Sequence, residues 1–183
     1  LITFVFSTLT WFLLIRLLMQ KAHANWHNPL SQITIRITEK MIRPLRAIIP
    51  GFKGIDYSII VAAIIIQMIE QTTIFWISQQ QFPQFIGLSL LSIASVLYTL
   101  KYLIFFIVII SALSSWFVHP SQANPFIQII DQIANPIFQP IRKRMPIMKG
   151  IDFSAIVIII GLQLIEILVI SPLYQFGLQQ LHH

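Results

Sequence analysis

Four apolar stretches, each close to the length needed to cross a lipid bilayer, constrain this chain more than any other feature. They run over residues 3–20, 57–78, 85–118 and 153–170. A helix needs roughly 20 consecutive apolar residues to span the hydrocarbon core. Only 10% of the 183 residues are charged and 56% are hydrophobic, whereas soluble domains carry about 25% charged residues. We therefore predict an all-α integral membrane protein with four transmembrane helices.

The third stretch is long enough to raise the question of whether it crosses once or twice. As one helix, its 34 residues would measure roughly 50 Å. Positively charged residues beside membrane spans favour the cytoplasmic side. Ten of the twelve Lys and Arg residues fall in two blocks, Lys21, Arg36, Lys40, Arg43, Arg46 and Lys53, and Arg142, Lys143, Arg144 and Lys149. Because an odd number of crossings must separate two cytoplasmic blocks, we expect one long tilted or bent helix, with both termini on the outer side.

The sequence contains an internal repeat. Sliding the chain against itself by 96 positions aligns Asn28–Glu70 with Asn124–Glu166 without a gap, and 19 of the 43 positions are identical. Each unit consists of a span, a basic connection and a second span in the same orientation, unlike the inverted repeats of many transporters. We assign residues 1–80 to the first unit and residues 81–183 to the second, related by a pseudo-two-fold axis along the membrane normal.

Each basic connection is predicted to begin with a helix. Asn28 and Asn124 are each followed by proline, which is typical of a helix start because Asn caps the first amides and Pro fits the first helical position. We expect the prolines of the motif that follows to end these helices, Pro44 and Pro50 in the first copy and Pro140 and Pro146 in the second. A helix with an apolar stripe and basic flanks can lie in the plane of the lipid headgroups, or its apolar stripe can pack on the protein's own spans. Both interpretations stay open for the two apolar stripes, Leu30, Ile33, Ile37 and Met41, and Phe126, Ile129, Ile133 and Ile137.

The pattern Pro-x-Arg-x-x-x-Pro-x-x-x-Gly-x-Asp follows in both copies. Its glycine can adopt the positive φ of a sharp turn, and its aspartate can cap the next span beside the positive end of the helix dipole. The turn should return the arginine to the aspartate. The arrangement is either a structural Arg–Asp pair or a duplicated arginine clamp for a lipid phosphate or ligand. The residues concerned are Arg46, Gly54 and Asp56 in the first copy and Arg142, Gly150 and Asp152 in the second.

Several polar residues interrupt the predicted spans, and ionisable groups at such positions are candidates for function. Glu70 lies 14 residues beyond Asp56, which is roughly 21 Å deeper along a helix. We predict that Lys101 pairs with one of the two glutamates, and that Arg16 extends to the inner surface. Three interpretations stay open for the glutamates and glutamines: they hold helices together through buried hydrogen bonds, they line a route for protons or cations, or they face the outer interface. The intramembrane polar residues are Gln67, Glu70, Lys101, Gln163 and Glu166.

The sequence carries no recognisable catalytic motif. It has no cysteine, no glycine-rich phosphate loop, no nucleophile elbow and no carboxylate dyad. His23 and His27 are spaced for metal binding, but no cysteine or acidic cluster accompanies them. We expect no catalytic residue, no cofactor and no metal. Because the net charge of +6 is concentrated beside membrane spans, the expected partners are the bilayer and anionic lipid headgroups rather than nucleic acid.

The order of these motifs is similar to that of the YggT family of small bacterial membrane proteins. The resemblance rests on NPLSQITIRITEKMIRPLRAIIPGFKGIDYS in the first copy and on NP and PIRKRMPIMKGIDFS, preceded by SSWF, in the second. The first copy departs from the family at Arg46-Ala47, where Arg-Arg is frequent, and at Lys53-Gly54, where Gly-Gly is usual. The resemblance implies a multi-pass protein of the bacterial inner membrane. Relatives are linked to osmotic or potassium tolerance, to cell division and, in plastids, to haem attachment on a membrane cytochrome.

We therefore expect a non-enzymatic scaffold or assembly factor. Its basic face would contact anionic lipid, other membrane proteins or a second copy of the chain. The alternative is a channel or transporter that conducts potassium ions or protons or responds to osmotic stress. A pore of this kind would need several copies, because four helices rarely enclose a channel alone.

Overall fold

A computed structural model describes residues 1–49, 51, 54–117, 124–144 and 153–181. None of these residues lies in a β-strand. The helical elements are α1 (Ile2–Lys21), α2 (Pro29–Arg46), α3 (Tyr57–Gln79), α4 (Phe85–Phe117), α5 (Pro125–Arg142), α6 (Ser154–Ile165), the π-helical turn η2 (Glu166–Ile170) and α7 (Ser171–Gln179).

Four helical segments are long and apolar enough to cross a membrane, which confirms the predicted all-α architecture. They are α1, α3, α4 and the continuous segment formed by α6, η2 and α7. The third span is a single helix of 33 residues, as the placement of the basic blocks predicts. The fourth span continues to Gln179 instead of ending at Ile170, because Pro172 falls in the first turn of α7. The π-helical turn just before it changes the backbone hydrogen-bond pattern where proline offers no N–H.

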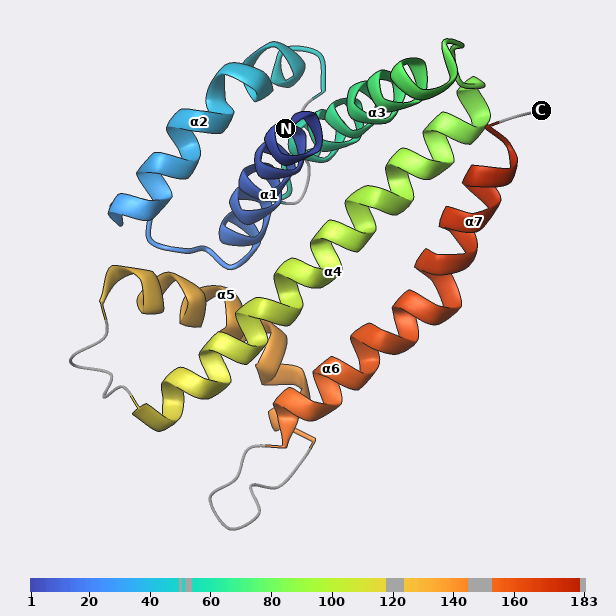
Figure 1. Cartoon of the computed structure of the whole chain (residues 1–183). Coiled ribbons are helices and arrows are strands. Elements are labelled where there is room, and N and C mark those ends of the chain that lie inside the picture. The colour runs from blue at the N-terminus through green and yellow to red at the C-terminus, as the bar shows by residue number, and fades with distance from the viewer. Residues whose placement is uncertain (50, 52–53, 118–123, 145–152, 182–183) are drawn as a thin grey trace.

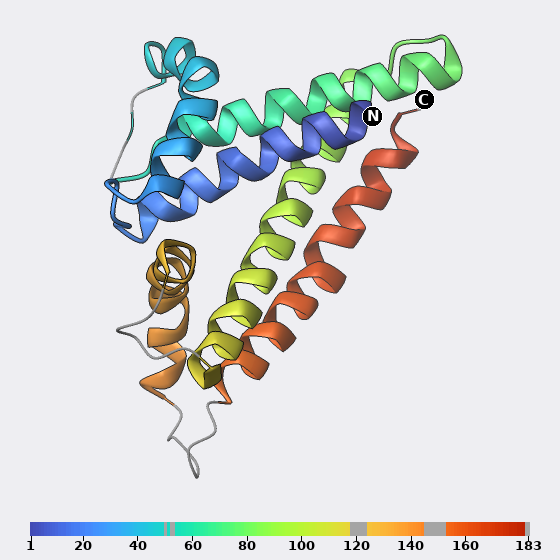
Figure 2. The ribbon, with the colours of Figure 1, turned by 60° about the vertical axis from the view of Figure 1, so that its left-hand side comes forward.

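The spans pair as two hairpins in chain order. α1 packs along α3, α4 packs along α6 and α7, and α3 joins the hairpins through α4 (Figure 1). Both termini and the turn between α3 and α4 lie at one end of the spans, and α2 and α5 lie at the other (Figure 2). The two basic connections therefore share one side of the bundle, which is the arrangement that a parallel repeat requires.

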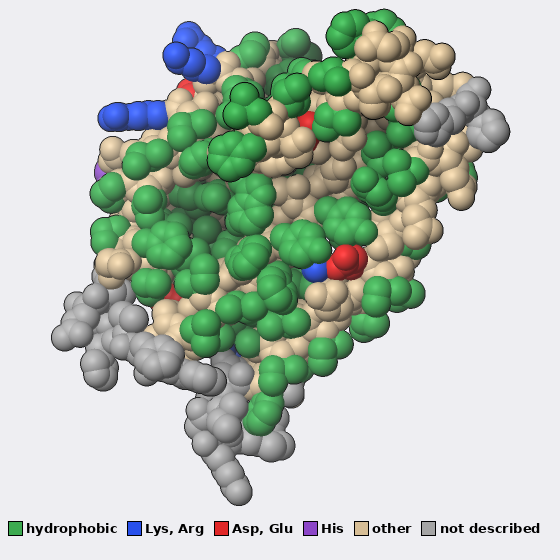
Figure 3. Space-filling view, in the orientation of Figure 1, with side chains coloured by type: hydrophobic (Ala, Val, Ile, Leu, Met, Phe, Trp, Pro, Cys, Tyr) green, Lys and Arg blue, Asp and Glu red, His purple; other side chains and the backbone are tan. Residues whose placement is uncertain are grey.

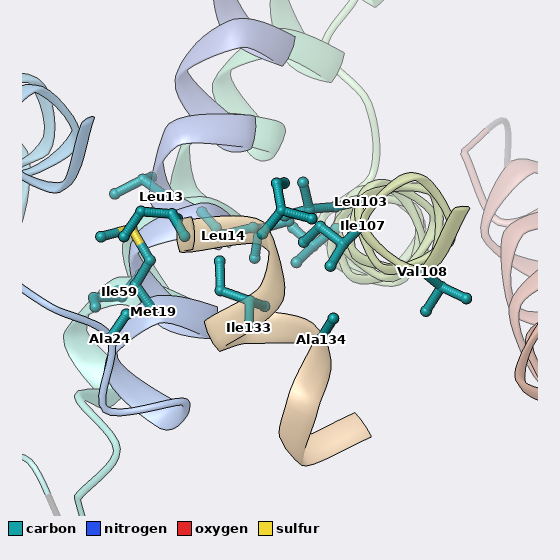
Figure 4. Packing of buried hydrophobic residues seen from close by; sticks show 14 of the residues in the cluster. Leu13, Leu14, Met19, Ala24, Ile59, Leu103, Ile107, Val108, Ile133 and Ala134 are labelled. Carbon is teal, nitrogen blue, oxygen red and sulfur yellow. The ribbon is translucent and has the colours of Figure 1, made fainter. Parts of the chain in front are cut away.

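The main core lies where the two repeats meet beside α2 and α5. Asn28 Nδ2 donates to Pro125 O at 2.9 Å, and the backbone N–H of Asn25 donates to Gln132 Oε1 at 2.8 Å. These bonds join the start of α2 to α5. Buried apolar residues from both repeats also form one cluster, so the repeats share a single core and are not separate domains. Buried members from both repeats include Leu13, Leu14, Met19, Ile59, Leu103, Ile107, Ile133 and Ala134 (Figure 4).

At the opposite end of the bundle, glycines allow α4 and α7 to approach closely. A Cβ atom on Gly87 would lie 2.6 Å from the backbone of Gln180, and one on Gly177 would lie 2.9 Å from Leu91 N. Small residues commonly permit such contacts between membrane helices, because lipid supplies no hydrophobic force to press the helices together. The glycines therefore fix the distance between the third and fourth spans.

The helices α2 and α5 end inside the repeated proline motif, between its first and second prolines, and Pro44 and Pro140 themselves lie in the last helical turn. α2 continues to Arg46 and α5 continues to Arg142. Both prolines are exposed and lie in the last turn, where the carbonyl group left without an N–H donor can be hydrated. The local cost of proline is therefore small at these positions.

Candidate functional site

Asparagine and aspartate begin three of the helices, as the sequence predicts. Asn28 Oδ1 accepts from Leu30 N, and Asn124 Oδ1 accepts from Ile127 N, each at 3.0 Å. Asp56 Oδ1 accepts from Ser58 N at 3.1 Å and also from the Ser58 hydroxyl group. These caps satisfy amides that have no partner inside the helix, so they fix where α2, α3 and α5 start.

The predicted Arg–Asp pair is present in the first repeat. Gly54 has φ of +77°, and the turn returns Asp56 to Arg46, whose Nε and Nη2 atoms donate to Asp56 Oδ2 at 2.9 and 2.7 Å. Asp56 is 6% exposed. Arg46 Nη1 also lies 3.4 Å from Glu39 Oε1, so two carboxylates already occupy its guanidinium group. This geometry favours the structural interpretation over a free phosphate clamp.

In the second repeat, Gly150 and Asp152 lie outside the described residues, so the corresponding pair stays a prediction. Arg142 is described, and its guanidinium carbon lies 4.4 Å from the ring centroid of Phe138. Stacking of this kind holds a cation against an aromatic face.

Arg16 is buried against α2, and its predicted extension to the inner membrane surface stays a prediction. It is 7% exposed, and its guanidinium group donates to Glu39 Oε2 at 2.7 Å and to Thr38 Oγ1 at 2.8 Å. A buried charge needs such partners, and α2 supplies them. Charges therefore alternate from α1 through α2 to the start of α3, in the order Arg16, Glu39, Arg46 and Asp56.

Both carboxylates in this chain of charges stay ionised at neutral pH. The hydrogen bond from Arg16, reinforced by the charges of Arg16 and Arg46, lowers the pKa of Glu39 despite partial burial. For Asp56, burial is the largest single influence and acts upward, but hydrogen bonds from Ser58 and Arg46 and the charge of Arg46 together lower its pKa. The positive charges of Arg16 and Arg46 are thus compensated within the structure.

The predicted pairing of Lys101 with a glutamate is confirmed, and the partner is Glu166. Lys101 Nζ lies 2.6 Å from Glu166 Oε2 and 4.0 Å from the ring centroid of Tyr102. Figure 3 shows an acidic and a basic group side by side between α4 and the fourth span, within a mainly hydrophobic face. A further polar contact, between Tyr98 Oη and Ser171 Oγ at 2.8 Å, joins the same two spans.

The glutamine and glutamate of the first repeat lie in a different environment from those of the second. Gln67 Nε2 donates to Glu70 Oε2 at 2.7 Å and to Thr10 Oγ1 of α1 at 3.2 Å, and both α3 residues are buried. Gln163 is exposed instead. At the same offset of 96 positions, an aromatic residue, Phe106, corresponds to Thr10, so the second repeat has no hydroxyl group at that position.

The sequence analysis did not identify several residues that complete these contacts. Glu39 was a detectable candidate, because it is the one acidic residue among six cations in the first basic block. Ser111 Oγ donates to Asp131 Oδ1 at 2.7 Å and joins α4 to α5, but no local pattern relates two residues that are 20 positions apart. The other missed partners are Thr10, Thr38, Ser58, Tyr98 and Ser171.

The cavities between the repeats are lined almost entirely by apolar side chains. One of about 170 Å³ lies among α1, α2, α4 and α5, and one of about 380 Å³ lies beside the Gly54 turn. Lys21 is the charged residue that lines the larger cavity. These spaces suit hydrocarbon better than ions or water.

Comparison with known proteins places this architecture in a family. The model of the CCB3/YggT family matches residues 1–77 and 90–173, which cover both repeats. The chain belongs to the CCB3/YggT family. Together with the four candidate spans, this membership makes it a multi-pass membrane protein.

Relatives in the CCB3/YggT family match nearly the whole chain. An uncharacterised protein of Pseudomonas aeruginosa is 40% identical over 161 residues, covering 87% of this chain and 81% of that protein. The protein YggT of Escherichia coli is 34% identical over 184 residues, covering 96% and 93%. A protein of Vibrio alginolyticus is 30% identical over 179 residues, covering 95% of each. No solved structure matches the chain.

Proposed function

We propose that the chain is a non-enzymatic scaffold or assembly factor of the bacterial inner membrane. The side that carries α2 and α5 faces the cytoplasm in this proposal, and both termini lie on the outer side. Its basic surface binds anionic lipid headgroups and holds partner proteins at the membrane.

The observation that carries the proposal is a difference between the acidic and the basic side chains. Each acidic side chain that the structure describes has a partner within the chain: Arg16 and Arg46 for Glu39, Arg46 for Asp56, Gln67 for Glu70, Ser111 for Asp131 and Lys101 for Glu166. Cations of α2 and of the two residues directly after α5 are exposed instead, at Arg36, Lys40, Arg43, Lys143 and Arg144. The outer charge of this described surface is therefore positive.

The three faces of α2 suit a helix at the membrane surface. Its packed face consists of Ser31, Thr34, Thr38 and Ile42. Next to that face, Ile33 and Ile37 are 49% and 37% exposed, and Arg36, Lys40 and Arg43 follow at spacings of four and three residues on the far side. Protein, hydrocarbon and headgroups can each contact one face of such a helix.

The expected strength of lipid binding follows from the number of exposed cations. A Lys or Arg near an anionic membrane surface contributes about 1 kcal/mol, which corresponds to a factor of about five. The three cations of α2 could therefore raise the preference for anionic lipid by up to about two orders of magnitude, less the screening that salt provides.

Native mass spectrometry of the detergent-purified chain tests this proposal. The protein is offered equal amounts of phosphatidylglycerol and phosphatidylcholine, and the lipids retained are counted. The wild type should retain phosphatidylglycerol preferentially, and Arg36→Gln/Lys40→Gln/Arg43→Gln should lose at least tenfold of that preference. The matched control, Arg36→Lys/Arg43→Lys, preserves every charge and should keep it. No lipid preference in the wild type, or an unchanged preference in the glutamine variant, contradicts lipid binding by α2.

Two further measurements separate a scaffold from a pore. Affinity capture after cross-linking in native membranes should recover partner proteins with the wild type and the lysine control but not with the glutamine variant. Planar bilayers containing the reconstituted protein should show no conductance. A conductance that changes in Glu70→Gln or Glu166→Gln would support ion conduction instead.

A further inference from the structure

The glutamine and glutamate of the fourth span reach the outer surface of the bundle, whereas their counterparts in α3 do not. Gln67 and Glu70 are 4% and 3% exposed. Gln163 is exposed, and 19% of the Glu166 side chain is accessible. The fourth span therefore exposes polar side-chain atoms at positions where α3 buries the equivalent atoms.

These polar atoms lie well inside the candidate membrane span Ser154–Gln179. Gln163 follows nine residues after the start of the span Ser154–Gln179, so it lies roughly 14 Å along the helix. Lipid tails offer no hydrogen bonds at that depth. The Gln163 side chain has no hydrogen-bond partner among the described residues, and Lys101 pairs with the Oε2 atom of Glu166. An amide in this position is costly unless another molecule covers it.

Gln163 lies within an exposed aliphatic stripe. Ile156 and Ile160 precede it by seven and three residues and are 51% and 54% exposed. Ile167 follows four residues later and is 62% exposed. Spacings of four, three and four residues keep side chains on one side of a helix, and a single polar residue in such a seam commonly sets the register and the number of helices that associate.

We propose that the stripe of Ile156, Ile160, Gln163 and Ile167 is a self-association surface that binds the same stripe of a second copy of this chain. Two copies inserted in the same orientation carry their Gln163 side chains at equal depth. A two-fold axis along the membrane normal brings these side chains together. Because a primary amide both donates and accepts hydrogen bonds, the two groups satisfy each other, and the second oxygen atom of Glu166 offers a further acceptor.

The stripe favours a second copy over another membrane protein because of this complementarity. A different partner needs a polar side chain placed at the same depth, whereas a second copy has one by symmetry. The inference goes beyond the proposed lipid-binding function, since self-association through α6 and η2 is independent of what the surface of α2 binds.

Cross-linking of the full chain in liposomes tests the geometry, and the absence of native cysteine allows single-cysteine variants. Ile160→Cys places a thiol in the stripe. Ile165→Cys is the matched control, because Ile165 is 52% exposed on the same helix but lies about 140° around it from residue 160. Mild oxidation should produce disulfide-linked dimers of Ile160→Cys and few or none of Ile165→Cys. Equal cross-linking at the two positions overturns the proposed surface.

Energy transfer between labelled copies, measured over a range of protein-to-lipid ratios, tests the role of the amide. Each copy carries one dye at Ser78→Cys, in the exposed end of α3. Gln163→Leu should weaken dimerisation roughly 3- to 30-fold, as expected for hydrogen bonds between membrane helices. Gln163→Asn retains an amide and should retain most of the affinity. Unchanged dimerisation of the leucine variant, with an unchanged unfolding midpoint, overturns the role of Gln163.

A wild-type chain that stays monomeric at every protein-to-lipid ratio overturns self-association altogether. A different membrane protein would then have to cover the stripe. The lipid-retention experiment on α2 would be unaffected by that result, so the two proposals fail separately.

Discussion

Replacing Asp56 tests whether the charged residues at the start of α3 hold the first repeat together. Asp56 caps α3 through Ser58 N and accepts two hydrogen bonds from Arg46. Loss of a helix cap costs about 1 kcal/mol. The Arg46 side chain is 42% exposed, so the ion pair contributes only about 0.5–1 kcal/mol. Asp56→Ala should therefore lower the free energy of unfolding by about 1.5–2 kcal/mol. Asp56→Asn keeps a capping oxygen and should lower it by only about 0.5–1 kcal/mol.

The pH dependence of stability separates the charge from the cap. The pKa of Asp56 is lowered from its ordinary value of 3.8 by bonds to Ser58 and Arg46, which outweigh the upward effect of burial. The unfolded chain therefore binds more protons in acid, and stability rises with pH. This contribution is fully present above about pH 4 to 5 and is lost as the pH falls through the lower folded pKa. Asp56→Asn should show a weaker acid dependence, and Glu39→Gln should remove part of what remains.

Thermal unfolding of the full chain in a non-ionic detergent, followed by circular dichroism from pH 3 to pH 7, measures both effects. For a chain of this size, 1 kcal/mol shifts the midpoint by about 2–4 °C. At pH 7 we expect losses of about 3–8 °C for Asp56→Ala and about 1–4 °C for Asp56→Asn. The reasoning is refuted if both variants lose the same stability and keep the acid dependence of the wild type.

Two further predictions concern contacts between the third and fourth spans. Lys101→Met should lower the free energy of unfolding by about 3 kcal/mol, because it leaves the Glu166 carboxylate without its cation. Adding Glu166→Leu should recover most of that loss. Equal stability of the single and double variants in denaturant-induced unfolding argues against the pair. Gly177→Ala should cost about 1–3 kcal/mol, because its Cβ would lie 2.9 Å from Leu91 N in a tightly packed contact. Gly161→Ala, whose Cβ meets no atom within 4 Å, should instead gain up to about 1 kcal/mol, and a similar loss in both glycine variants would contradict close packing by Gly177.

The local sequence determined the helices and the turn with its ion pair that precedes α3. Apolar length predicts the four spans, Asn28 and Asn124 predict helix starts, and the ten residues from Arg46 to Asp56 predict the ion pair. These features depend on capping, turn geometry and contacts within a few turns, so a short stretch of chain contains the information. The proline motif predicts the helix ends to within a turn, and Pro44 and Pro140 fit in the last turn because the exposed helix end can be hydrated.

The tertiary structure alone decided which of the duplicated polar groups became buried. Gln67 and Gln163 occupy the same repeat position, yet α1 covers the first with Thr10, and the second stays exposed. Lys101 could have joined either glutamate, and the packing of α4 against the fourth span selected Glu166. The physical reason is that a polar group in a membrane is stabilised by whichever helix packs beside it, and that neighbour is set by contacts between residues far apart in the chain. A repeated motif fixes depth and helix face, but only the packed structure fixes its partner.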